Sequence, residues 1–354
     1  MKLAIKWENA QVDEAGRVSG HSAGDTLVRR ILRNFPDSIL IGGSARRAEN
    51  FSVAPIEMLD PTDTAVINMD VIDSPRLWQK MHNAGAEKPH IMNFMWWSPR
   101  EMTTVEGIAS MALSCALFPT FANSERTAME VREIAEKWTV KPLHEQMQLG
   151  WVNLGFRLAH VRPRVETEVP VVLYPSIYLS AKKRPDIFLD VVNWVHRQIP
   201  LRVEMRLHET HLVSEAAMKF SHRDWIWVGP LTATRQSYWE ALAHTTAFLA
   251  TTEEESYGIE YVEALGAGVI GVFPDLEWAH ALVPADYPFF YKSVEEAKNM
   301  LWQVLVKPAE ARKKMDASAG GSIQKWIGEH HSDDVFDEAL IQHVVDWLGD
   351  IPHA

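Results

Sequence analysis

Short apolar runs alternate along the chain with longer segments in which apolar residues recur every three or four positions. The short runs are typical of buried strands, and the longer segments are typical of amphipathic helices. In the first half, strands are expected at 2–7, 38–41, 65–69, 91–97 and 116–121, and helices at 25–34, 74–83, 103–114 and 125–137. In the second half, strands are expected at 171–174, 202–207, 225–228, 246–250 and 269–273, and helices at 185–198, 235–243, 255–266 and 333–348. This alternation predicts an α/β protein with mainly parallel sheets covered on both faces.

A charged, proline-containing stretch at 162–168 separates the two series, and such a composition is typical of a linker between domains. The chain has 354 residues, of which 47% are hydrophobic, so two domains can each bury a core. Its formal net charge of −12 disfavours non-specific nucleic-acid binding as the main activity and leaves room only for a local basic groove.

A single cysteine, Cys115, allows no intrachain disulfide and suits a reducing, cytoplasmic location. No run reaches the roughly 18–20 apolar residues of a membrane-spanning helix. We therefore expect a protein without a membrane span, and the absence of a Cys/His cluster with zinc spacing suggests no metal site.

One segment carries the candidate chemistry: Glu255-Ser-Tyr-Gly-Ile-Glu-Tyr-Val-Glu263, followed by small residues up to Gly268. It comes after an apolar, strand-like run and opens the predicted helix at 255–266. Its two outer glutamates stand eight residues apart, which is a rise of roughly 12 Å along a helix. Backbone N–H groups at the start of such a helix would face a diphosphate. By themselves, two glutamates on an amphipathic helix are more often its solvated face.

This segment resembles the Glu-x7-Glu motif of retaining GT-B glycosyltransferases, the large family that includes bacterial mannosyl- and glucosyltransferases. Trp227-Val-Gly-Pro230 and Val272-Phe-Pro-Asp275 flank it in the family's order, and the resemblance is strongest over 171–305. It implies a GT-B fold, in which two Rossmann-like, doubly wound domains face each other across a cleft and a final helix crosses back to the first. On that basis we expect an acceptor-side domain at 1–156, a nucleotide-sugar domain at 168–332, and a terminal helix at 333–354 that packs on the first domain.

The resemblance also implies roles for donor-side residues. Glu255 would contact the donor sugar hydroxyls and orient the anomeric carbon, and Glu263 would accept hydrogen bonds from the ribose. Gly229 would lie near the base, and Gly20 would lie near the leaving phosphate. Backbone N–H groups of the four residues after Glu255 would hold the sugar and phosphate: Ser256, Tyr257, Gly258 and Ile259.

The family also places an arginine after the first strand of its second domain and a lysine about six residues later, both on the diphosphate. Here Ser176 stands where the arginine is expected, and Lys182 or Lys183 matches the lysine. Arg184 is a candidate to replace the missing arginine. Such cations would stabilise the charge that bond cleavage leaves on the diphosphate; a solvated basic turn is the alternative. The chain has no Asp-x-Asp triplet, so we expect a metal-independent reaction with no cofactor besides the donor.

On the acceptor side, His21 lies in a Gly-rich first loop, although a histidine there is more often a capping or surface residue. Trp96 and Trp97 end a strand at the same edge, where many relatives have a histidine. These tryptophans are either core residues or a platform on which an acceptor stacks. Two short basic clusters are either solvated or meet an anionic acceptor: Arg29, Arg30, Arg33, Arg46 and Arg47.

From these features we expect a cytoplasmic, retaining hexosyl- or pentosyltransferase that uses a nucleotide-diphosphate sugar. The acceptor stays open between a small molecule, a glycan, a lipid head group and a hydroxylated base in DNA, and the donor and oligomeric state also stay open. Two other functions are compatible with the sequence. One is a sugar-nucleotide epimerase of the same fold. The other is a non-catalytic subunit that only binds sugar nucleotide, which the serine at Ser176 and the missing histidine leave open.

Overall fold

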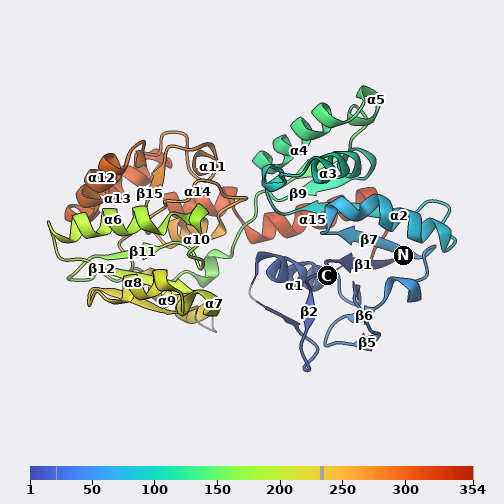
Figure 1. The fold of residues 1–354 in the computed structure, drawn as a ribbon, viewed down its shortest axis with the longest axis horizontal. Helices are drawn as coiled ribbons and strands as arrows, with labels where there is room; N and C mark the ends of the chain where they lie inside the picture. Colours follow the sequence, from blue (N-terminus) through green and yellow to red (C-terminus); the bar gives the residue numbers. More distant parts are fainter. Residues whose placement is uncertain (21, 232–234, 354) are drawn as a thin grey trace. The chain divides into compact units, whose positions relative to one another are not determined.

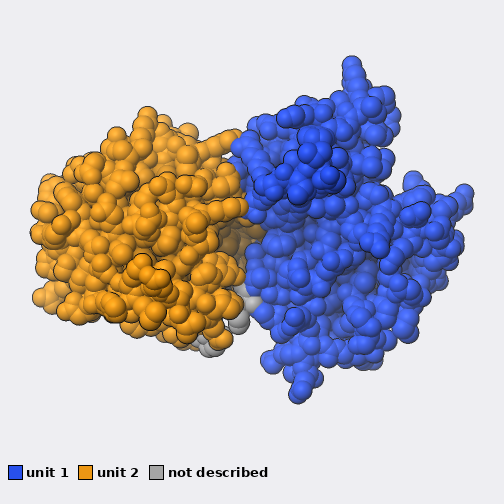
Figure 2. All heavy atoms as spheres, in the orientation of Figure 1, with its two compact units in different colours: residues 1–153, 334–354 blue, residues 154–333 orange. Residues whose placement is uncertain are grey.

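The computed structural model describes residues 1–20, 22–231 and 235–353. Two compact units make up the chain: unit 1 is Met1–Asn153 with Asp334–Ala354, and unit 2 is Leu154–Asp333 (Figure 1; Figure 2). Each unit contains a sheet of mainly parallel strands, so the predicted α/β class is confirmed. Among the described helices, none is both long and apolar enough to cross a membrane.

Unit 1 is built on an eight-stranded sheet in the order β10-β9-β8-β7-β1-β4-β6-β5. Its strands are β1 (Lys2–Lys6), β4 (Ile39–Ile41), β5 (Arg46–Arg47), β6 (Ser52–Ala54), β7 (Thr64–Asn68), β8 (His90–Met95), β9 (Thr120–Ala122) and β10 (Leu149–Trp151). All neighbouring pairs are parallel except β5 with β6. The loop after β1 forms a separate antiparallel hairpin of β2 (Gln11–Val12) and β3 (Val18–Ser19). The hydropathy pattern missed β2, β3, β5, β6 and β10, because strands of two or three residues are too short to show a period.

The helices of unit 1 are α1 (Ala23–Asn34), α2 (Ser74–Asn83), α3 (Val105–Leu117), α4 (Glu125–Trp138), α5 (Lys141–His144) and α15 (Asp333–Leu348), with the 3-10 turns η1 (Ile56–Met58), η2 (Val71–Asp73) and η3 (Pro99–Glu101). Side-chain caps fix several of their starts: Ser22 and Asp25 form a capping box at α1, and Thr104 and Ser124 cap α3 and α4. The strand expected at 116–121 was wrong at its start. It begins only at Thr120, as β9, because α3 continues through the apolar residues up to Leu117.

The last helix, α15, belongs to unit 1. It buries one side chain every four residues, at Phe336, Leu340, Val344 and Leu348, which is the spacing of a single helix face. The Phe336 ring centre lies 5.8 Å from that of Phe121. The guanidinium of Arg30 lies 4.0 Å from the Phe336 ring centre, and its Nε lies 2.7 Å from an oxygen of Asp337. The final helix therefore packs against the sheet and first helix of unit 1, as the implied fold requires.

Unit 2 is built on a six-stranded, fully parallel sheet in the order β13-β12-β11-β14-β15-β16. Its strands are β11 (Val171–Tyr174), β12 (Arg202–Leu207), β13 (Ile226–Pro230), β14 (Ala247–Leu249), β15 (Ile270–Pro274) and β16 (Phe290–Tyr291). Its helices are α6 (Pro185–His196), α7 (Glu209–Leu212), α8 (Glu215–Ser221), α9 (Arg235–His244), α10 (Ile259–Gly266), α11 (Glu277–His280), α12 (Val294–Val306), α13 (Pro308–Ser318) and α14 (Ile323–His330), with the 3-10 turns η4 (Leu158–His160) and η5 (Ala181–Lys183). One continuous apolar core, which includes Phe188, Phe248 and Phe273, fills the unit.

The helix that was expected to begin at Glu255 begins instead at Ile259. Gly258 precedes it with φ 89° and ψ 48°, a left-handed conformation that no residue inside a right-handed α-helix adopts. Glu255 therefore lies in a loop, and the helical rise of roughly 12 Å does not describe its separation from Glu263.

Candidate functional site

Two loops of unit 2 meet at the carboxyl ends of neighbouring parallel strands. β11 pairs with β14, so the basic turn after β11 and the glutamate loop after β14 leave the sheet at the same edge. Hydrogen bonds from one backbone amide and two threonine hydroxyls join the two loops. The carbonyl of Lys182 accepts from the Glu253 amide at 3.1 Å and from the Thr252 hydroxyl at 3.1 Å. The carbonyl of Lys183 accepts from the Thr251 hydroxyl at 2.8 Å. These bonds fix the basic turn beside the glutamate loop.

Lys183 and Glu255 form a direct, hydrogen-bonded ion pair in this arrangement. Their side chains are 17% and 10% exposed, so the pair is largely removed from water. The same ammonium lies 3.7 Å from an oxygen of Glu260, and the Tyr261 hydroxyl donates a 3.1 Å hydrogen bond to Glu255. One lysine, two carboxylates and one phenol thus converge at the edge of the sheet.

Burial raises the pKa of the Glu255 carboxyl to about 7, and the nearby charge of Glu260 adds to this rise. Lys183 and the hydrogen bond from Tyr261 act in the opposite direction but do not cancel the effect of burial. A carboxyl group with such a pKa changes protonation state near neutral pH. The contact between Glu255 and Lys183 is therefore one that a bound ligand or a proton can alter.

The other predicted cations lie differently. Lys182 is exposed, and its side chain has no polar contact with any described residue. Arg184 adopts a left-handed conformation with φ 47°, and its guanidinium lies 3.2 Å from the exposed carboxylate of Glu253. Ser176 is buried and bonds to the Tyr178 backbone, donating at 3.1 Å and accepting at 3.2 Å. Of the three basic residues in the turn, Lys183 is the one that the structure brings to Glu255.

The residues that follow Glu255 shape the loop. The Tyr257 side chain is buried, and its hydroxyl contacts the Leu154 carbonyl and the Nδ1 atom of His331. A Cβ atom at Gly258 would lie 2.7 Å from the Tyr261 ring, so the glycine is required by both its conformation and its neighbour. Ser256 lies in the loop and Ile259 is the first residue of α10. This segment leads into the N-terminus of α10, where an anion is favoured.

Two further donor-side candidates lie elsewhere in unit 2. Glu263 lies on α10 and is 6% exposed. Gly229 lies on β13, where a Cβ atom would approach the Trp227 ring to 2.2 Å. The guanidinium of Arg206, on the neighbouring strand, lies 5.3 Å from a ring centre of Trp227, within the range of a cation–π contact. Gly229 thus allows the Trp227 ring to approach the backbone closely at the carboxyl end of β13.

The candidates in unit 1 have local structural contacts. Gly20 has φ 93°, and a Cβ atom there would lie 2.4 Å from the carboxylate of Asp25, which caps α1. The Nε1 atom of Trp96 donates to the Met69 carbonyl at 3.3 Å, and Trp97 packs against an apolar cluster in the core. His21 lies outside the described residues.

The sequence interpretation missed Thr251, Thr252, Glu260 and Tyr261 as contributors to this site. Each has an ordinary local explanation: the threonines follow the end of β14, and the helix residues fit an amphipathic pattern. Their contribution to one site becomes visible only when the loops after β11 and β14 are brought together. A second carboxylate five residues after Glu255 was the one signal available in the sequence.

Comparisons with known proteins give the fold. No protein-family model matches the chain, and no curated protein matches it in sequence. Among solved structures, HepE from Anabaena in complex with UDP has a TM-score of 0.71 at 13% identity, covering 98% of this chain and 100% of that one. The lipopolysaccharide outer core galactosyltransferase WaaB has a TM-score of 0.66 at 13% identity, covering 98% and 99%. TarM from S. aureus has a TM-score of 0.61 at 12% identity over 80% of this chain, which spans only 56% of the TarM chain.

At these identities the likeness concerns the backbone. It agrees with the two α/β units and their mainly parallel sheets. The chain therefore has the GT-B fold, with two Rossmann-like units.

Proposed function

We propose that this protein is a retaining, metal-independent glycosyltransferase that moves a sugar from a nucleotide-diphosphate sugar to an acceptor hydroxyl. The observation that carries the proposal is the buried Lys183–Glu255 pair, fixed where the loops after β11 and β14 meet. Parallel α/β sheets bind ligands at this edge. Structures similar in fold include HepE in complex with UDP and the galactosyltransferase WaaB, which supports the choice of a sugar nucleotide.

The proposed reaction breaks the bond between the sugar's anomeric carbon and the diphosphate oxygen. A bond forms between that carbon and the acceptor oxygen on the same face of the sugar, and the acceptor proton passes to the leaving diphosphate. Negative charge grows on the diphosphate as the first bond breaks. Lys183 would stabilise this charge, and amides at the start of α10 would hold the phosphate.

Glu255 would have two successive partners in this reaction. Without a ligand it neutralises Lys183. With the donor bound, the sugar hydroxyls would donate to Glu255, and Lys183 would turn to the diphosphate. The raised pKa of Glu255 makes this exchange easier, because the carboxylate is already poorly stabilised by its buried surroundings. Glu263 would accept from the ribose hydroxyls, and no cofactor besides the donor is proposed.

A panel of UDP-, GDP- and ADP-sugars tests the proposal, with the purified protein and a set of hydroxylated acceptors. Release of the nucleoside diphosphate together with a sugar–acceptor product of retained configuration supports transfer. An isomerised sugar nucleotide would instead identify an epimerase. Binding without any turnover would identify a non-catalytic subunit, the function that Ser176 favours because it supplies no second cation. A Glu255→Gln variant serves as the inactive control.

A further inference from the structure

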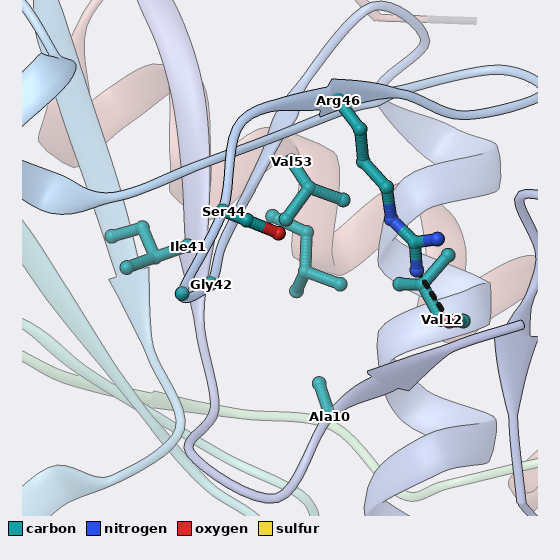
Figure 3. Close-up of a pocket in the computed structure, with 9 residues that line it drawn as sticks. Ala10, Val12, Ile41, Gly42, Ser44, Arg46 and Val53 are labelled. Carbon is teal, nitrogen blue, oxygen red and sulfur yellow. Dashed lines mark hydrogen bonds between the residues drawn. The ribbon is translucent and has the colours of Figure 1, made fainter.

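A pocket of about 180 Å³ lies in unit 1 at the carboxyl end of β4 (Figure 3). The end of β4, the loop that follows it, β6 and the β2 side of the hairpin form its walls. The lining residues are Ala10, Val12, Leu40, Ile41, Gly42, Gly43, Ser44, Arg46 and Val53. Because all the strands around β4 except β5 are parallel, this is the sheet edge at which α/β proteins bind ligands.

Arg46 supplies the positive charge of this pocket. Its guanidinium is fixed by a hydrogen bond to the carbonyl of Val12 (Figure 3) and by one of 3.3 Å to the carbonyl of Asp13. Carbonyl oxygens hold the side chain in place without neutralising it, and no carboxylate among the described residues pairs with Arg46. The Asp13 carboxylate is engaged by Arg17, whose amide donates to it at 2.9 Å. An arginine has five N–H donors, so several remain for a ligand.

The loop after β4 adds neutral donors. Figure 3 shows the Ser44 hydroxyl turned into the pocket. Within the described part of the chain, neither this hydroxyl nor the backbone amides of Gly43 and Ser44 have a hydrogen-bond partner, whereas the Gly42 amide donates to the Ala54 carbonyl at 3.0 Å. A group with several acceptor oxygens would satisfy these donors together with Arg46.

Apolar side chains make up the remaining walls. Leu40 and Val53 are 1% and 7% exposed, and Ile41 and Ala10 are also among the lining residues. These apolar side chains would contact the carbon part of a ligand, while the exposed Ser44 and Arg46 would face its anionic group. The positive charge of Arg46 matters for anion binding because the whole chain has a net charge of −12.

From this combination we infer that the pocket binds an anionic group, a phosphate or a carboxylate, of the acceptor substrate. Its volume of about 180 Å³ is below the roughly 300–1,000 Å³ of pockets that enclose whole small ligands, so it fits one group of a larger molecule. Calling this molecule the acceptor rests on the proposed glycosyl transfer. The presence of an anion site in unit 1 does not depend on it.

The test uses nuclear magnetic resonance of the ¹⁵N-labelled full chain with glycerol 3-phosphate as the probe and glycerol as its uncharged counterpart. Moderate salt suppresses weak surface binding. We expect the Gly43 and Ser44 amide signals to shift with glycerol 3-phosphate and to stay unchanged with glycerol. Arg46→Gln should weaken this binding about 10-fold or more, because a charge-assisted contact is lost.

Arg47→Gln is the matched control. Arg47 neighbours Arg46 on the two-residue strand β5, carries the same charge and is not among the lining residues. It should leave the affinity within about twofold, since Arg46 and Arg47 are both exposed but only Arg46 lines the pocket. Equal weakening by both variants would indicate diffuse surface attraction and overturn the inference, as would the absence of binding to the native chain. Affinities for UDP, GDP and ADP measured on the same samples separate this result from the proposed function: failure of all three to bind would contradict the transferase and leave the anion pocket standing.

Discussion

Lys183 in unit 2 and Arg46 in unit 1 both lie at the carboxyl edge of a parallel sheet, but their charges are held in opposite ways. Lys183 is paired with a buried carboxylate, Glu255. Arg46 is held by backbone carbonyls and meets no carboxylate among the described residues. An anion that reaches Lys183 must displace a charged partner, whereas an anion that reaches Arg46 displaces none. Under the proposed function, Lys183 would exchange its carboxylate partner for the diphosphate during catalysis. Arg46, which has no such partner to lose, would serve recognition of the acceptor.

The largest expected effect comes from removing the carboxylate of Glu255. Glu255→Gln should lower sugar transfer by about 100-fold or more, because a reacting sugar that is misplaced by about 1 Å loses that much rate. Binding of the bare nucleoside diphosphate should not weaken, since this ligand lacks the sugar and no longer has to displace a charged Glu255 from Lys183. Glu253→Gln, in the same loop but with a side chain 61% exposed, is the control and should stay active. Equal loss of affinity for the nucleoside diphosphate and the sugar nucleotide would contradict a sugar-facing role for Glu255.

The second prediction separates two neighbouring lysines that the sequence does not distinguish. Lys183→Ala should lower turnover by about 100-fold, because one electrostatic contact to the developing diphosphate charge is lost. Lys182→Ala should keep most of the activity, since its exposed side chain is apart from Glu255. Steady-state turnover with the sugar nucleotide at saturation measures both. If the Lys182 variant loses as much as the Lys183 variant, the buried pair is not the catalytic feature of the turn.

The third prediction concerns pH. Burial raises the pKa of Glu255 from 4.5 to about 7 in the folded protein. Its protonated form therefore contributes stability that is fully present below pH 4.5 and is lost as the pH rises through about 7. We expect the native chain to lose on the order of 1–3 kcal/mol relative to Glu255→Gln across this window. Urea unfolding at pH 5 and pH 8 measures the difference, and a difference that does not vary with pH would mean that Glu255 is ionised throughout.

The smallest expected effect concerns the loop itself. Tyr257→Phe removes the hydroxyl that contacts the Leu154 carbonyl and His331, and it leaves these buried groups without that partner. The free energy of unfolding should fall by about 1–2 kcal/mol. Tyr178→Phe is a suitable control, because the Tyr178 hydroxyl bonds to no other described residue and the change should be nearly neutral. An unaltered unfolding midpoint in the Tyr257 variant would show that the loop does not depend on this contact.

Much of the fold follows from local sequence. The predicted helices at 74–83 and 333–348 have the bounds of α2 and α15, and the strands expected at 171–174 and 202–207 are β11 and β12. Periodicity and capping depend on residues a few positions apart, so they can be read directly from the chain. The same reasoning placed the start of α10 four residues too early. A glutamate-rich segment is compatible with a helix, and the left-handed Gly258 that excludes one is visible only in the structure.

The sequence by itself determined two series of alternating strands and helices, and it identified Lys182, Lys183 and Glu255 as candidates. Only the tertiary structure chose between the lysines, because Lys183 and Glu255 are 72 residues apart and meet through the adjacency of β11 and β14. The pocket at Arg46 also required the fold, since its walls come from the hairpin, β4 and β6. Local patterns fix which segments are strands, but strand order decides which loops share an edge. Burial at that edge then sets the charge state of the groups that meet there.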